Sequence, residues 1–155
     1  MLLAFNRQGK VRLSKFYSTY TAKEKARYTR EIINNVLSRG PNHCNFVLWR
    51  EYTLVYQKYA SLYFIIITDQ SDNELISLEV IHQYVVILDT IFENICELDL
   101  IYDFERAYLV LDEFLLAGEM QDTSSKEIVK NYREALAFEK HILITEALDQ
   151  TFSGM

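Results

Sequence analysis

Glycine and proline are scarce in this chain, with four glycines and one proline among 155 residues. Because these two residues dominate turns and linkers, their scarcity predicts few long loops and argues against a low-complexity chain. Half of the residues are apolar and 14% are aromatic, which favours a packed core. We therefore expect residues 1–155 to form a single domain, in which residues 135–155 are a helical tail.

Cysteine is also rare. Cys44 and Cys96 lie far apart and match no metal-ligand spacing, so we expect buried free thiols in a reducing compartment, with no metal and no cofactor. The apolar run at residues 1–5 is too short for a signal peptide, and no uncharged stretch approaches the roughly 20 residues that span a bilayer. These absences predict a cytosolic protein whose membrane contact is indirect.

Acidic residues are few in the first part of the chain and basic residues are few in the second. Residues 1–60 hold 11 Lys and Arg against 3 Asp and Glu, residues 61–155 hold 5 against 19, and the net charge is −6. This asymmetry predicts two faces for differently charged partners. A pI near 5.1 argues against nucleic-acid binding.

Hydrophobic patterning predicts strands followed by helices. We expect a hairpin of strands 2–6 and 11–17 around Gln8-Gly9-Lys10, a helix from its cap Thr21 to Arg39, and strands at 45–49, 52–59 and 60–68. A period of 3.6 residues then predicts helices over 75–92 and 104–115, and Ser124 or Ser125 begins a last helix that extends toward Leu148. This order predicts an α+β fold with helices on the faces of a five-stranded sheet.

No catalytic motif stands out. Glu79 and His82 form half of a di-metal pattern, but its second half is absent. The acidic cluster Glu97, Asp99, Asp103 and Glu105 lacks both a calcium-loop order and a neighbouring nucleophile, and we interpret it as a solvated or partner-facing rim. There is also no phosphate-binding loop and no nucleophile elbow, so we expect no enzyme activity.

Four runs of sequence carry a whole-chain resemblance. They are Gln8–Tyr17, Tyr59–Phe64, Ile95–Phe104 and Leu111–Glu119. In this order and spacing they closely resemble the small (sigma) subunits of heterotetrameric clathrin adaptor complexes, from residue 1 to about 130. The resemblance implies a longin-like (SNARE-like) domain with a five-stranded antiparallel sheet, and the residue pattern adds a C-terminal helical extension, where the segment after about residue 135 matches no family pattern.

The resemblance also implies a function in vesicle-mediated protein transport, namely recognition of acidic dileucine signals, [DE]xxxL[LI], in cargo tails. Arg12 would receive the acidic residue, and the apolar pocket would comprise Ala60, Leu62, Val85, Asn94, Ile95, Leu98 and Leu100. From the residues alone, the apolar members of this set are simply core. Gln57-Lys58 departs from the family pattern, since many relatives hold two basic residues there, which bears on signal affinity.

Partners and location follow from the same resemblance. It implies a large subunit with a helical-solenoid trunk, a second large and a medium subunit, and contact with clathrin and membrane only through the complex. We expect an apolar patch around Phe16, Tyr17, Trp49 and Tyr52 to face the large subunit. Three segments are most similar to the trans-Golgi and endosomal adaptor, namely Trp49-Arg50-Glu51, Asp72–Ile76 and Gln121–Ser124, and the plasma-membrane adaptor is second. The alternative is a coatomer zeta-like subunit or a free-standing longin-type module.

Overall fold

The computed structural model describes residues 1–116, 119–120, 130, 133–134 and 137–138. A five-stranded sheet runs through the middle of the molecule, and every pair of neighbouring strands is antiparallel. Its strands are β1 (Leu2–Asn6), β2 (Val11–Lys15), β3 (Phe46–Trp49), β4 (Tyr52–Tyr59) and β5 (Leu62–Asp69), in the spatial order β2-β1-β5-β4-β3. The predicted α+β fold and antiparallel sheet are confirmed.

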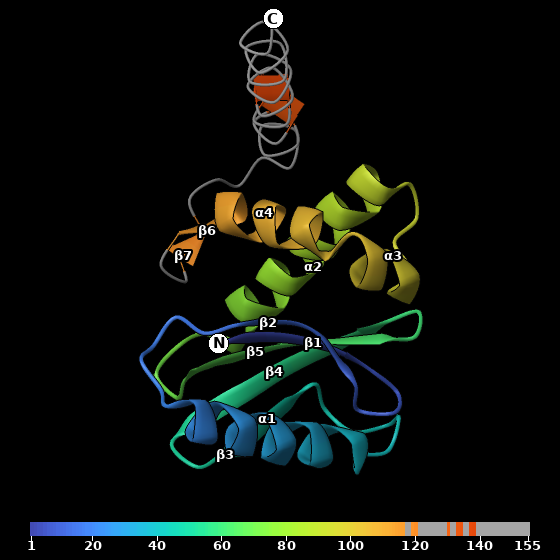
Figure 1. The fold of residues 1–155 in the computed structure, drawn as a ribbon. Helices are drawn as coiled ribbons and strands as arrows, with labels where there is room; N and C mark the ends of the chain where they lie inside the picture. Colours follow the sequence, from blue (N-terminus) through green and yellow to red (C-terminus); the bar gives the residue numbers. More distant parts are fainter. Residues whose placement is uncertain (117–118, 121–129, 131–132, 135–136, 139–155) are drawn as a thin grey trace, which may run out of the picture.

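Helices cover both faces of the sheet (Figure 1). On one face lies α1 (Ala22–Leu37), which begins at a capping box formed by Thr21 and Glu24, as the sequence predicted for Thr21. On the other face lie α2 (Glu74–Phe92), α3 (Glu97–Tyr102) and α4 (Phe104–Phe114). The result is three layers with the sheet in the centre.

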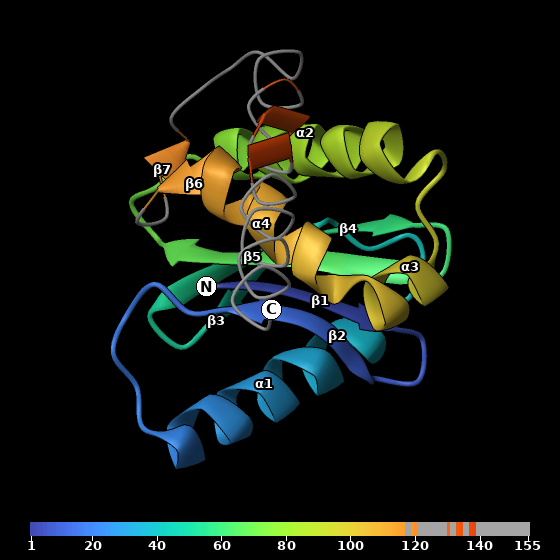
Figure 2. The ribbon, with the colours of Figure 1, turned by 45° about the horizontal axis from the view of Figure 1, so that its top comes forward.

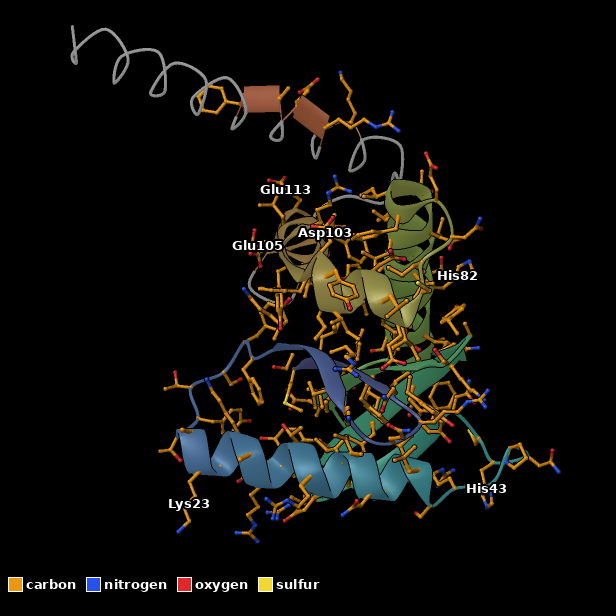
Figure 3. All side chains as sticks on the ribbon, turned by 45° about the vertical axis from the view of Figure 1, so that its right-hand side comes forward. Lys23, His43, His82, Asp103, Glu105 and Glu113 are labelled. Atoms are coloured by element: carbon orange, nitrogen blue, oxygen red, sulfur yellow. The ribbon has the colours of Figure 1, made fainter. Side chains whose placement is uncertain are left out.

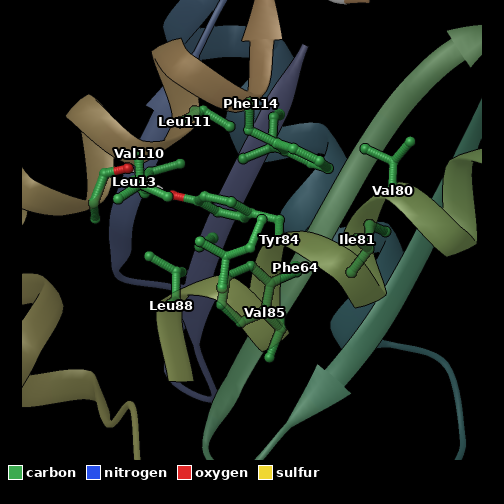
Figure 4. Close-up of a cluster of buried hydrophobic side chains, with 14 of the residues drawn as sticks. Leu13, Phe64, Val80, Ile81, Tyr84, Val85, Leu88, Val110, Leu111 and Phe114 are labelled. Carbon is green, nitrogen blue, oxygen red and sulfur yellow. Dashed lines mark hydrogen bonds between the residues drawn. The ribbon is translucent and has the colours of Figure 1, made fainter. Parts of the chain in front are cut away.

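Successive side chains of each strand point to opposite faces of the sheet, so the core has two parts, one on each face. In β1 all five residues are buried, because Leu3 and Phe5 pack toward α1 while Leu2 and Ala4 pack toward α2 and α4. In the layer of α2 and α4, Tyr84 is fully buried and its hydroxyl donates a hydrogen bond of 2.8 Å to the carbonyl of Ala107 (Figure 4). This bond joins α2 to α4 inside the core.

Helix α2 is long and apolar enough, by length and composition, to cross a membrane. Seven of its residues are buried in the fold, including Ile81, Tyr84 and Leu88. A core helix of a folded domain has the same composition, and here burial against the sheet accounts for it.

Some predicted boundaries of strands and helices were wrong, and some short elements were missed. Strand β5 begins at Leu62 rather than at residue 60, because Ala60 and Ser61 form a two-residue turn between the paired Tyr59 and Leu62. The short helix α3 and the hairpin of β6 (Leu115–Leu116) and β7 (Glu119–Met120) were not predicted. The last predicted helix, with its cap at Ser124 or Ser125, falls mostly outside the described residues.

The two cysteines also differ from expectation. Both are free, but both are exposed rather than buried. Cys44 lies in the connection between α1 and β3, and Cys96 immediately precedes α3. Both therefore lie in surface connections, where hydrophobic burial does not act on the thiol.

Candidate functional site

One end of the sheet gathers the residues that the sequence singled out. There the β1–β2 hairpin, the β4–β5 turn and α3 lie side by side (Figure 2). Register places Asn6 of β1 opposite Leu62 of β5, and the Asn6 side chain reaches Glu97 at the start of α3. Residues far apart in sequence thus meet at one edge of the molecule.

Part of the predicted pocket set lies in one hydrophobic cluster. Leu62, Val85 and Leu100 are 2%, 6% and 2% exposed, and Ile95 packs against the same cluster from a partly buried position. Figure 4 shows Val85 among these core side chains. The structure brings these four residues together, but it buries three of them beneath the surface.

The other predicted pocket residues lie at the surface. Leu98 on α3 is 59% exposed, with Ile101 and Tyr102 of the same helix exposed beside it. Ala60 and Asn94 are exposed and both have positive φ, 51° and 79°. Left-handed backbone is uncommon for residues other than glycine, so both positions mark tight chain reversals. Leu98 is thus the large apolar member of the set that is freely accessible.

Arg12 belongs to a hydrogen-bonded network at the margin of this cluster. Its Nε donates to Glu97 Oε1 at 2.9 Å, and Asn6 Nδ2 donates to the same oxygen at 2.8 Å. These hydrogen bonds, from Asn6 first and then Arg12, hold the pKa of Glu97 below its ordinary value. Glu97 is therefore ionised at neutral pH, next in sequence to Leu98.

Sequence reasoning placed Glu97 only in an acidic rim and did not single out Asn6. The signal for Asn6 is its position just before the hairpin turn Arg7-Gln8-Gly9-Lys10, where an Asn side chain commonly binds backbone N–H groups. Its Oδ1 accepts hydrogen bonds from the backbone N–H of Gln8 and of Lys10, both at 2.9 Å.

Two of the remaining acidic residues of the predicted rim have local partners. Asp99 Oδ2 accepts a hydrogen bond of 2.9 Å from the backbone N–H of Cys96, and Asp103 pairs with Arg106 at 3.1 Å. Asp103 and Glu105 lie at the beginning of α4, apart from His82 on α2 (Figure 3). Within the part of the chain that the structure describes, no group of three or more His, Cys, Asp or Glu residues is arranged to hold a metal ion.

The half-motif on α2 has an ordinary structural arrangement. Glu79 accepts a hydrogen bond from Gln83 at 3.1 Å, and the ring nitrogen Nδ1 of His82 lies 3.1 Å from the hydroxyl of Tyr59. The first contact lies within α2, and the second joins α2 to Tyr59 at the end of β4.

Gln57 and Lys58 lie near the end of β4. Gln57 accepts a hydrogen bond of 2.9 Å from Asn45, while Lys58 is exposed and lies 5.8 Å from the ring centre of Tyr63. Lys58 therefore keeps its charge at the surface of this end of the sheet.

Two concavities are present among the described residues, and none of the eight predicted site residues lines them. The first, about 840 Å³, lies between α1 and β2 and includes Lys15, Lys25 and Arg30. The second, about 610 Å³, is bordered by aromatic residues that include Tyr17, Trp49 and Tyr52. The second concavity therefore contains three of the four residues of the predicted partner patch.

Comparison with known proteins identifies the family of this chain. The family model described as clathrin adaptor complex small chain matches residues 1–137. The chain is similar to AP-1 complex subunit sigma-1 of Dictyostelium discoideum, with 63% identity over 151 residues and 97% of each chain covered. It is also similar to AP-1 complex subunit sigma-3 of Homo sapiens, with 53% identity over 129 residues, covering 83% of this chain and 84% of the relative.

Among solved structures, the chain resembles one in a homology model of the full-length AP-3 complex in a stretched open conformation. The TM-score is 0.70 at 25% sequence identity, and the match covers 94% of this chain and 96% of the other. A family match over most of the chain, relatives above half identity and a shared fold lead to one conclusion. The chain belongs to the family of clathrin adaptor complex small chains.

Proposed function

We propose that this protein is a small subunit of an AP-1-type adaptor complex that helps to recognise acidic dileucine sorting signals in cargo tails. The observation that supports the proposal is that an apolar surface and an arginine lie next to each other. Leu62, Val85, Ile95 and Leu100 share an apolar cluster, Leu98 is exposed beside it, and Arg12 binds the residue next to Leu98. An apolar surface beside a guanidinium suits a ligand with leucines and an upstream carboxylate.

The burial of Leu62, Val85 and Leu100 bears on how a signal would dock. A cargo leucine gains free energy only where it covers accessible apolar surface, which here means Leu98 and the accessible part of Ile95. We infer that the signal's leucines first contact α3 and the segment before it. The buried residues then support this surface from below, and their exposure would require a local opening of the structure.

The second concavity supports a large-subunit contact. Its aromatic border, with Tyr17, Trp49 and Tyr52, is continuous with Ile76, which is 60% exposed. Arg50 stacks over Trp49 at 5.1 Å, and its guanidinium is paired with Glu31 at 2.8 Å. We infer that the trunk of the large subunit covers this region, and that the second large and the medium subunit complete the complex.

Location follows from this assignment. As part of an AP-1-type complex the protein would act on the cytoplasmic side of trans-Golgi and endosomal membranes and of clathrin-coated vesicles. It would reach membrane and clathrin through the other subunits. The role is one of binding, without catalysis.

Leu98→Ser tests the proposal. In the assembled complex, this variant should weaken binding of a fluorescent Glu-x-x-x-Leu-Leu peptide about tenfold or more, because one leucine contact is worth roughly 1.5–3 kcal/mol. Since Leu98 is 59% exposed, folding should not change. Leu48→Ser, at a leucine that is 71% exposed on β3, is the matched control and should bind as the wild type does. Equal affinity of the two variants would contradict the proposal.

A further inference from the structure

The guanidinium expected to receive the signal's acidic residue already has a carboxylate partner in the protein. Arg12 Nε and Glu97 Oε1 are 2.9 Å apart, and the two side chains are only 22% and 25% exposed. A charge-assisted hydrogen bond of this length is among the stronger polar contacts in proteins. A signal carboxylate therefore approaches an arginine whose charge is largely balanced.

The position of Glu97 is fixed from behind. Asn6 donates to the same Oε1 atom, and Asn6 itself is 7% exposed with its own Oδ1 accepting the N–H groups of Gln8 and Lys10. Because those two contacts fix the orientation of the Asn6 amide, its NH₂ group points to Glu97. The hairpin turn thus holds Glu97 against Arg12.

We propose that Glu97 competes with the signal's carboxylate for Arg12. This competition lowers the affinity of the site for acidic signals and sets how much the signal's carboxylate contributes to the free energy of binding. The inference rests on the proposed function and assigns a specificity-determining residue to the same site. An incoming carboxylate must either displace Glu97 from Nε or bind the terminal Nη atoms close to a second negative charge. Both routes cost free energy that a neutral residue at position 97 would not impose.

Glu97→Gln isolates the charge. The amide oxygen of Gln can accept both hydrogen bonds that Oε1 accepts now, so the variant keeps the network and removes only the negative charge. Glu105→Gln is the matched control, because Glu105 is an exposed acidic residue on α4 and, among the described residues, forms no salt bridge. It removes the same charge from the same end of the molecule without touching Arg12.

The experiment titrates the assembled complex, as wild type and as each variant, with two fluorescent peptides that carry Glu or Gln four residues before the leucine pair. We expect Glu97→Gln to bind the Glu peptide about three- to fivefold more tightly, the range for partly exposed ion pairs, and to leave the Gln peptide unchanged. Glu105→Gln should match the wild type with both peptides.

Each other outcome contradicts the inference. An unchanged or weakened affinity of Glu97→Gln for the Glu peptide would mean that Glu97 only positions Arg12. Equal gains for both peptides, or an equal gain in Glu105→Gln, would mean a general charge effect. If the wild-type complex and Glu97→Gln bind neither peptide, the proposed function itself fails and this inference fails with it.

Discussion

Arg12 is partly exposed at one edge of the sheet. Reversing its charge distinguishes the contribution of the signal's acidic residue from that of its leucines. Arg12→Glu should weaken the peptide with an upstream Glu by about tenfold or more, since a charge-assisted contact is worth roughly 1.5–3 kcal/mol. A peptide with Gln at that position should bind almost as before. Titration of both peptides against the wild-type and the variant complex compares the four affinities. Equal losses for both peptides would assign Arg12 to folding or assembly.

For single residues, the sequence predicted which positions belong to the candidate site better than it predicted how exposed their side chains are. The pattern places Leu62 and Leu98 in one set, yet one is 2% and the other 59% exposed. Exposure depends on which neighbours cover a side chain, and Leu62 is buried in a cluster to which α2, α3 and α4 contribute side chains. Likewise, the partner of Arg12 lies 85 residues away, at a distance where sequence spacing carries no information.

Elements were predicted well where a period extends over several turns or strands. The three long helices and all five strands of the main sheet appear in the structure at or near their expected positions. Helix α3 is six residues long, too short for a period to stand out, and begins after Cys96, which is not a preferred cap. The turn at Ala60 lacks the Gly or Asn that a left-handed residue usually requires, so the pattern assigns Ala60 and Ser61 to the strand that follows them.

Strand β2 is an edge strand, and Tyr108 of α4 covers part of that edge. Its hydroxyl accepts from the backbone N–H of Ser14 at 2.8 Å and donates to the carbonyl of Ser14 at 3.1 Å. We expect Tyr108→Phe to lower the free energy of unfolding by about 1–2 kcal/mol and to speed hydrogen exchange at the Ser14 amide. Thermal unfolding and exchange measured by mass spectrometry on the assembled complex test this.

The control for that variant is Tyr102→Phe, which removes a hydroxyl from a tyrosine that is 82% exposed. Its stability and its exchange in β2 should equal those of the wild type. Protection at Ser14 that persists in Tyr108→Phe would show that another group covers the edge.

At the scale of the whole molecule, we expect the chain to depend on its partner. Leu48, Leu75 and Ile76 are 71%, 66% and 60% exposed, which is costly in water for large apolar side chains. Expressed alone, the protein should self-associate, whereas co-expression with the trunk of an adaptor large subunit should give a soluble pair. Ile76→Glu should weaken that pair, and Leu98→Ser should not. Size-exclusion chromatography distinguishes these cases, and a stable monomer with no affinity for any trunk would favour a free-standing module.

The fold of the described residues was predictable because the sequence closely resembles a family, and the comparisons confirm that membership. For the candidate site, the sequence predicted which residues belong to it but not how they are arranged or exposed. Whether those positions form an open surface depends on the packing of α2, α3 and the β4–β5 turn, which arises from contacts between distant segments.

The most direct test of the central claim is to map where a signal's leucines bind. An acidic dileucine peptide that carries photo-leucine at each leucine position would be irradiated in the presence of the assembled complex, and the cross-linked residues identified by mass spectrometry. We expect cross-links in this chain at residues 94–101, with Leu98 foremost, and none with a peptide whose other leucine is alanine. Cross-links confined to other subunits, or to the concavity between α1 and β2, would contradict it.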